Sequence, residues 1–327
     1  MVEVQDLGER ALIELARRIC KVGPPVKVGV GDDAAVVEID GKYLVATTDM
    51  LVGHTHFPMG TPAKEMGWKA VVTNLSDLAA MGAEPLGLVF SVGLPRGTKA
   101  DFVRELLRSM NSCARRYGTY VVGGDLNESG DVVISGTAFG TVPKGGLLTR
   151  SGARAGDIVA VTGELGVAAA GVKMLLEKLP KRGYGKLLEA YAKPTARVRE
   201  GVFLARSGYA TAAIDVTDGL AANLWQISRM SKVKLVVDYS KIPVSPQVRK
   251  FARDHGFDER EFVLFGGEDF ELLFTVRRDG WEKVKRGLSR RHIKVSAIGE
   301  AVRGQGVYIR TEEGIEKMPD RGYEHFR

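Results

Sequence analysis

Short apolar runs typical of β-strands alternate with helical segments along the whole chain, but without the regular period of a βαβ fold. The expected strands cover residues 34–37, 43–47, 85–93, 120–122, 131–140, 157–161, 212–215, 234–237, 271–276, 294–298 and 306–309. The expected helices cover residues 7–20, 61–81, 98–117, 165–179, 196–207 and 218–229, with one more between the strands at 271–276 and 294–298. This irregular mixture predicts an α+β (mixed α/β) fold rather than a doubly wound parallel sheet.

Two of these helices carry clear positional signals. The helix at 61–81 is expected to begin with Thr61 as its N-cap and Pro62 at its first position. The helix at 7–20 is amphipathic and is expected to place Leu7, Ala11, Leu15 and Ile19 on one apolar stripe.

The length of the chain, 327 residues, exceeds what one hydrophobic core usually supports. After Lys144-Gly145-Gly146 the succession of strands and helices starts again. We therefore expect two domains, residues 1–145 with a sheet and helices and residues 146–327 with an α/β arrangement.

The net charge of +7 is compatible with an anionic ligand such as a nucleotide or a nucleic acid. No stripe of basic residues interleaved with aromatic residues is present, and pairs such as Lys181-Arg182 and Arg290-Arg291 are typical of solvent-facing helix ends. We therefore expect no nucleic-acid partner, although a non-catalytic nucleotide- or RNA-binding protein remains an alternative.

Nothing in the sequence predicts a membrane segment or a secreted protein. No apolar run approaches the roughly 18 residues needed to cross a bilayer, and the N-terminus lacks an apolar signal core. Cys20 and Cys113 form neither a disulfide framework nor a metal-binding spacing. These features predict a cytoplasmic protein.

A recurring local pattern places an acidic residue beside glycine or a small hydroxyl residue, at the end of an expected strand. The instances are Gly31-Asp32-Asp33, Thr47-Thr48-Asp49, Gly123-Gly124-Asp125, Asp215-Val216-Thr217-Asp218 and Gly266-Gly267-Glu268-Asp269. Each one alone is also compatible with an ordinary turn. Asp77 is different, because it lies in a helix of small and apolar residues one turn after Asn74, and a buried carboxylate needs a partner.

If several of these acids converge, they require bound cations. Two carboxylates about 4 Å apart repel by roughly 4 kcal/mol at an effective dielectric constant near 20. Oxygen ligands without Cys or His clusters favour Mg²⁺, Mn²⁺ or Ca²⁺ over zinc. The sequence has no Walker-type phosphate loop and only five histidines, a combination that suits metal-assisted phosphoryl transfer without a general base.

Taken in order, these residues resemble the thiamine-monophosphate kinase family. This family belongs to the superfamily of aminoimidazole ribonucleotide synthetase and selenophosphate synthetase. The resemblance runs over nearly the whole chain, through the acidic segments given above and through Asn74-Leu75-Ser76-Asp77-Leu78-Ala79-Ala80-Met81-Gly82-Ala83, Arg150-Ser151-Gly152-Ala153, Lys193-Pro194-Thr195 and Gly322-Tyr323-Glu324-His325-Phe326.

The resemblance implies a role for particular residues of this chain. The metal ligands would be Asp33, Thr47, Thr48, Asp49, Asp77, Asp125, Asp215 and Asp218. Apart from the resemblance, adjacent residues of an extended chain face opposite ways, so we expect Asp33 to be the ligand and Asp32 a supporting group. The nucleotide contacts would be Gly124, Asp125, Arg150 and Thr217. The substrate contacts would be His56, Glu268 and Tyr323.

The implied reaction is direct in-line transfer of a phosphoryl group from ATP to thiamine monophosphate, assisted by several Mg²⁺ ions. The resemblance also implies a homodimer formed through the N-terminal domains. Another ATP-dependent enzyme of the same superfamily, such as aminoimidazole ribonucleotide synthetase, remains the alternative activity.

Overall fold

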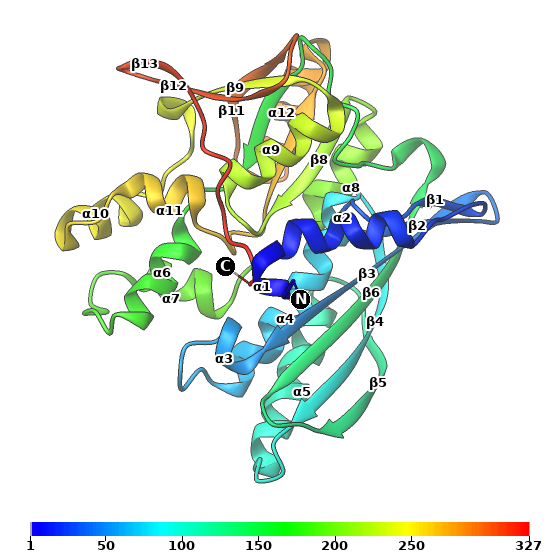
Figure 1. Ribbon diagram of the computed structural model, residues 1–327, viewed down its shortest axis with the longest axis vertical. Helices are drawn as coiled ribbons and strands as arrows, with labels where there is room; N and C mark the ends of the chain where they lie inside the picture. The colour runs from blue at the N-terminus through cyan, green and yellow to red at the C-terminus, as the bar shows by residue number, and fades with distance from the viewer. Residues whose placement is uncertain (1, 327) are drawn as a thin grey trace.

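The computed structural model describes residues 2–326, which form two β-sheets with helices packed between and around them (Figure 1). The predicted α+β class is confirmed. None of the helices within residues 2–326 combines the length and the apolar content needed to cross a bilayer.

The first sheet has six strands, and its members come from the N-terminal part of the chain. Their order across the sheet is β1 (Val26–Val28), β2 (Ala35–Ile39), β3 (Lys42–Val52), β6 (Val133–Pro143), β4 (Glu84–Leu94) and β5 (Val121–Glu128). Neighbouring strands are antiparallel except β4 and β5. That parallel pair is connected by α5 (Ala100–Arg116), as a parallel crossover requires.

Helix α4 (Ala63–Ala80) occupies the centre of the molecule, between the first sheet and the C-terminal part of the chain (Figure 1). It packs against α5, β3 and β6 on one side and against α8 and β8 on the other. A helix that is covered all round must be apolar or small all round, and most residues of α4 are buried. The prediction that Thr61 caps this helix is wrong, because Pro62 is the N-cap residue and the Thr61 hydroxyl donates to the Pro58 carbonyl instead.

The second sheet has seven strands. Their order is β13 (Gly314–Lys317), β12 (Gly306–Thr311), β9 (Lys234–Asp238), β11 (Val295–Val302), β7 (Ile158–Thr162), β10 (Glu271–Val276) and β8 (Ala210–Val216). All neighbours are antiparallel except β9 and β12.

Helices cover both faces of this second sheet. α8 (Val198–Ser207) and α12 (Trp281–Ser289) pack on the face turned toward α4, and α6 (Val167–Leu176), α9 (Leu220–Ser231), α10 (Pro246–His255) and α11 (Glu259–Phe265) pack on the other. Strand β10 shows the division, since Leu272 and Phe274 join the core around α4 whereas Leu273 joins the outer core. One hydrophobic core therefore includes residues from both parts of the chain.

The N-terminal segment differs from its prediction. The expected helix at 7–20 is two helices, α1 (Val4–Leu7) and α2 (Glu9–Ile19), which meet at Gly8 with φ +74°. No residue of α2 is buried, so the expected apolar stripe does not enter a core. The segment is held to the C-terminal tail by the Arg10–Asp320 ion pair at 2.8 Å, and the tail ends beside α1 (Figure 1).

Several other elements differ from the sequence-based expectation. β3 and β5 are longer than expected, so Thr47-Thr48-Asp49 and Gly123-Gly124-Asp125 lie within strands rather than after them. Helices α3 (Gly53–His56), α7 (Gly185–Ala192), α10 and α11 and strands β1 and β13 were not predicted.

Candidate active site

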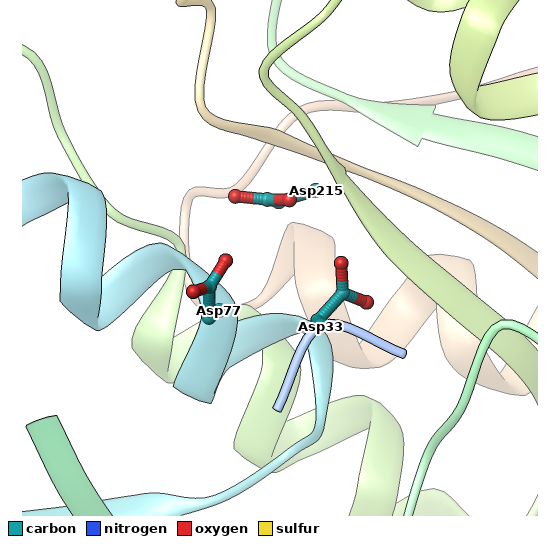
Figure 2. A group of neighbouring side chains, drawn as sticks. All are labelled: Asp33, Asp77 and Asp215. Carbon is teal, nitrogen blue, oxygen red and sulfur yellow. The ribbon is translucent and has the colours of Figure 1, made fainter. Parts of the chain in front are cut away.

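Three aspartates from distant parts of the chain meet at one end of α4. Carboxylate oxygens of Asp33, Asp77 and Asp215 all lie within 4.8 Å of one another. Figure 2 shows the three side chains turned toward a common point, from a loop, a helix and a strand respectively. We call these three residues the aspartate cluster.

Packing of the central helix accounts for this meeting. Asp77 lies in the last turn of α4, Asp215 lies near the end of β8, and Asp33 lies in the turn between β1 and β2. α4 contacts both β3 and β8, so it places Asp77 between the two sheets. α8 can approach α4 closely only because residue 201 is glycine, since a Cβ atom there would lie only 1.9 Å from the Ala79 carbonyl oxygen of α4.

The cluster is electrostatically unfavourable without a cation. Burial and the carboxylates of Asp49, Asp215 and Asp33 raise the pKa of Asp77 well above its ordinary value. Burial and the Asp33 carboxylate raise the pKa of Asp215 in the same direction. Oδ2 of Asp33 and Oδ2 of Asp215 are buried without any hydrogen-bond partner. Unpaired buried carboxylate oxygens in an all-oxygen group fit a hard divalent cation such as Mg²⁺.

Strand β3 adds two of the predicted residues to the cluster. The Thr47 hydroxyl donates to Asp77 Oδ2 at 2.5 Å. Asp49 lies on the same face of β3, where burial raises its pKa while a hydrogen bond with Asp77 opposes the increase. Asn74 orients this strand, since its Oδ1 accepts from the Asp49 amide at 3.3 Å.

Thr48 is placed differently from its two neighbours. Its side chain is exposed on the opposite face of β3, and its hydroxyl donates to the Gly136 carbonyl at 2.8 Å. The side chain of Thr48 is therefore not part of the aspartate cluster in this structure.

Arg150 is the cation nearest to the cluster. Its Nη2 and Nε donate to Asp33 Oδ1 at 2.6 and 3.1 Å, and its Nη1 donates to Gln226. Its backbone amide donates to Asp32 Oδ1 at 3.1 Å. Burial and the neighbouring Asp33 charge raise the pKa of Asp32 to about 6, with Arg150 opposing the increase. Asp33 thus belongs to the cluster, whereas Asp32 holds the Arg150 backbone beside it.

Thr217 and Asp218 follow Asp215 in the turn between β8 and α9. Burial raises the pKa of Asp218 to about 6. The Thr217 carbonyl accepts from the Glu268 amide at 2.9 Å, and the Asp218 carbonyl accepts from the Tyr323 amide at 3.0 Å. This turn therefore connects the cluster to the predicted substrate residues.

Gly124 and Asp125 do not join the other predicted residues. Both are exposed on β5, the edge strand of the first sheet. A Cβ atom at Gly124 would lie 2.0 Å from the Phe90 carbonyl oxygen, so close packing of β4 and β5 already requires a glycine there.

His56, Glu268 and Tyr323 are connected through His325 and Lys69, although they come from α3, the loop before β10 and the C-terminal tail. The His56 ring lies 5.3 Å from the His325 ring, which packs edge-on against Tyr323 at 5.0 Å. Lys69 connects Glu268 to His56, since its ammonium forms an ion pair with the Glu268 carboxylate and lies 3.4 Å from the His56 carbonyl oxygen.

Lys69 and His325 were not singled out in the sequence. The signal for Lys69 was present, because it is a lone cation in the apolar run from Met66 to Val72. A lysine in a helix buried on all sides needs a counter-charge from another element, as Asp77 does.

Comparisons with known proteins agree with this arrangement. Residues 31–142 match the family model "AIR synthase related protein, N-terminal domain", and residues 154–312 match the corresponding C-terminal domain. The chain is 40% identical to a thiamine-monophosphate kinase of Pyrococcus horikoshii over 300 residues, 91% of each chain. It is 32% identical to the Aquifex aeolicus protein of the same name over 329 residues, 99% of this chain and 100% of that one.

A solved structure described as "AaThiL complexed with AMPPCP and TMP" is 31% identical. It superimposes with a TM-score of 0.89 and covers 99% of both chains. Sequence relatives and structural neighbours therefore agree over the full length of the chain. The protein belongs to the thiamine-monophosphate kinase family, within the AIR synthase related proteins.

Proposed function

We propose that this protein transfers the terminal phosphoryl group of ATP to thiamine monophosphate, giving thiamine diphosphate and ADP. The aspartate cluster carries the proposal, because oxygens of its three carboxylates lie within 4.8 Å of one another and their charged forms repel unless cations are bound. The names of the relatives and the AMPPCP and TMP bound to the similar solved structure support the same reaction.

Asp33, Asp77 and Asp215 are the residues that would hold Mg²⁺, with Thr47 and Asp49 beside them. Bound Mg²⁺ neutralises phosphate charge and relieves the repulsion between two anionic substrates. Asp218, Thr48 and Asp125 remain proposed ligands on the family pattern alone. Asp218 lies in the turn that follows Asp215, whereas Thr48 and Asp125 are exposed in this structure.

Arg150 is proposed to contact the nucleotide phosphates, together with Thr217, Gly124 and Asp125. Its guanidinium is fixed beside the cluster by Asp33 and Gln226. Burial opposes its charge, but the neighbouring Asp33 and Asp32 carboxylates raise its pKa, so it stays positively charged. A fixed guanidinium can bind two phosphate oxygens at once.

No general base is required for the transfer. The attacking group is itself a phosphate oxygen, and a phosphate monoester with a second pKa of about 6 is already largely dianionic at pH 7. The task of the protein is to hold the two phosphates in line and to exclude other acceptors. His56, Glu268 and Tyr323 are proposed to bind the rings of thiamine monophosphate on the adjoining side.

We also propose that the protein is a cytoplasmic homodimer. On the first sheet, exposed apolar side chains lie on β3, β4 and β5 and just before β5, namely Met50, Leu86, Val122, Leu126 and Tyr120. Apolar residues clustered on one sheet favour an interface with a second copy of the chain. Cys20 and Cys113 are both free thiols, which suits a reducing compartment.

Product analysis with purified protein, ATP, Mg²⁺ and thiamine monophosphate tests the proposed reaction. We expect one thiamine diphosphate for each ADP, and a loss of at least about a hundredfold in kcat for Asp77→Asn, which removes a charged ligand. Asp101→Asn, at an exposed position of α5, should keep wild-type turnover. ATP consumption only with another acceptor, such as a formamidine ribonucleotide, would contradict the proposal.

A further inference from the structure

Lys69 is a buried cation that the proposed reaction leaves without a role. Its side chain is only 3% exposed, and its ammonium forms an ion pair with Oε1 of Glu268. The lysine lies on α4 and the glutamate in the loop before β10, so the pair joins the two parts of the chain. Lysine is rarely buried to this extent unless a partner compensates its charge.

Two aromatic rings and a carbonyl group surround the same ammonium. Nζ lies 5.4 Å from the centre of the Phe57 ring and 5.0 Å from that of Tyr191. It also lies 3.4 Å from the His56 carbonyl oxygen. The Tyr191 hydroxyl is fixed by Thr61 at 3.1 Å. Ring faces attract cations, so the ammonium has a single well-defined position.

Glu268 is held just as firmly at its backbone. It has φ +68°, a left-handed conformation that is uncommon for any residue other than glycine, and its amide donates to the Thr217 carbonyl. The adjacent Gly267 permits this approach, because a Cβ atom there would lie 2.2 Å from the same carbonyl oxygen. Strain of this kind persists where the surroundings fix a functional side chain.

The carboxylate of Glu268 nevertheless remains within reach of a ligand. Its side chain is 30% exposed, although its lysine partner is almost completely enclosed. A carboxylate that is paired on one side and open on the other can accept hydrogen bonds from a ligand without losing its counter-charge.

The spacing along α4 relates this pair to the aspartate cluster. Lys69 and Asp77 are eight residues apart on one helix, a rise of about 12 Å. If the phosphate of an extended substrate of similar length is bound at the cluster, the other end of that substrate can lie near Glu268, the partner of Lys69. Thiamine monophosphate has its phosphate at one end, its aminopyrimidine ring at the other and a cationic thiazolium between them, so a carboxylate and aromatic rings suit its far end.

Direct binding of phosphate by Lys69 is a weaker explanation. Its ammonium is almost completely enclosed and already pairs with Glu268. It is also separated from the cluster by two turns of helix.

We propose that Lys69 is a positioning residue, which fixes the Glu268 carboxylate for the ring end of thiamine monophosphate and takes no part in the transfer itself. The proposal rests on the proposed function, since it assigns one end of that substrate. It makes Lys69 a determinant of substrate affinity and specificity.

Steady-state kinetics of Lys69→Met tests this role. We expect the KM for thiamine monophosphate to rise roughly tenfold, because one charge-assisted contact with the substrate is lost. The kcat and the KM for ATP should stay within about twofold of wild type. Glu268→Gln should have the same effect. The double variant should be no worse than either single variant, because the two side chains act as one unit.

Two further variants exclude a merely structural effect. Lys69→Gln, which keeps a group able to donate to Glu268, should recover part of the lost affinity and serves if Lys69→Met does not fold. Lys173→Met is the matched control. Lys173, on α6, also forms an ion pair with a carboxylate, that of Glu177, and its Nζ lies 5.2 Å from the centre of an aromatic ring, that of Phe257. This variant should leave both KM values unchanged.

The outcomes separate this inference from the proposed function. If Lys69→Met lowers kcat or raises the KM for ATP to the same extent, or if its effect adds to that of Glu268→Gln, Lys69 is not a positioning residue for this substrate. If the wild-type protein fails to phosphorylate thiamine monophosphate at all, the proposed function itself is wrong.

Discussion

At the level of single residues, the aspartate cluster lowers the stability of the metal-free protein, because its members are placed to bind a cation. Asp77 has a raised pKa in the folded protein, because burial and three neighbouring carboxylates disfavour its charge. The folded state therefore binds more protons than the unfolded chain above about pH 4, and the free energy of unfolding falls as the pH rises through this range. Bound cations reverse this effect by pairing with the charged form.

Asp77→Asn should make the metal-free protein more stable, although we expect it to lose most of its activity. In EDTA we expect its melting temperature to exceed that of the wild type by a margin that grows as the pH rises, since the wild-type carboxylate then loses its proton and repels its neighbours. The difference should vanish toward pH 4, where the wild-type carboxylate is protonated. Thermal unfolding followed by circular dichroism measures both values.

Addition of Mg²⁺ gives the control for this prediction. The melting temperature of the wild type should rise with Mg²⁺ concentration more than that of Asp77→Asn, because ligand binding to the folded state stabilises it. A variant that is less stable than the wild type in EDTA would show that Asp77 is a structural residue whose charge is already compensated.

At the scale of elements, α4 is the part on which the site depends. It carries Asn74, Asp77 and Lys69, and it packs between the first sheet and α8. The contact with α8 is made backbone to backbone at Gly201, beside Ala79. A displacement of α4 would move Asp77 and Lys69 together, so this contact supports both ends of the site.

Gly201→Ala should loosen this contact. A Cβ atom would lie 1.9 Å from the Ala79 carbonyl oxygen, and overpacking of this kind costs about 1–3 kcal/mol. We expect a lower melting temperature together with weaker Mg²⁺ stabilisation. Gly185→Ala, in α7 where a Cβ atom meets nothing within 4 Å, should be neutral or slightly stabilising. Equal melting temperatures for the two variants would mean that the α4–α8 contact relaxes freely.

At the scale of the whole molecule, the first sheet carries the proposed contact with a second copy. Val122 and Leu126 lie on the edge strand β5 and are 58% and 61% exposed. Val122→Asp combined with Leu126→Asp should turn a dimer into a monomer, because charges at the centre of an apolar interface lose their hydration. Light scattering coupled to gel filtration measures the mass.

Ile315→Asp is the control for the dimer. Ile315 is also an exposed apolar residue, at 57%, but it lies on β13 at the edge of the second sheet. It should leave the mass unchanged. A wild-type protein of monomer mass would refute the proposed dimer, and a mass unaffected by the β5 substitutions would place the interface elsewhere.

The class of fold and the position of the central helix could both be predicted before the structure was known. Hydrophobic periodicity and turn residues predicted the long elements well, because α4 and β10 are buried along most of their length and α5 buries one apolar face. Asp77 was recognisable as functional from its own helix, since a carboxylate among small apolar residues has no local partner. The ordered acidic segments sufficed to identify the family.

Short elements and strand limits were decided by packing. α7, α10 and α11 are too short to be stable by propensity alone and form because the outer core covers them. β3 and β5 extend through their polar segments because neighbouring strands pair with them. The boundary expected at residue 145 stays a prediction, as the core around α4 includes side chains from both sides of it.

Which polar residues meet could not be predicted from any local pattern. Asp33, Asp77 and Asp215 come from three elements, and no local pattern shows that their carboxylates share one point while Asp125 lies exposed on an edge strand. The partner of Lys69 is equally remote, in a loop of the second part of the chain. The physical reason is common to both cases: buried charges are stabilised by partners in space, and the packing of α4 between two sheets determines which partners come within reach.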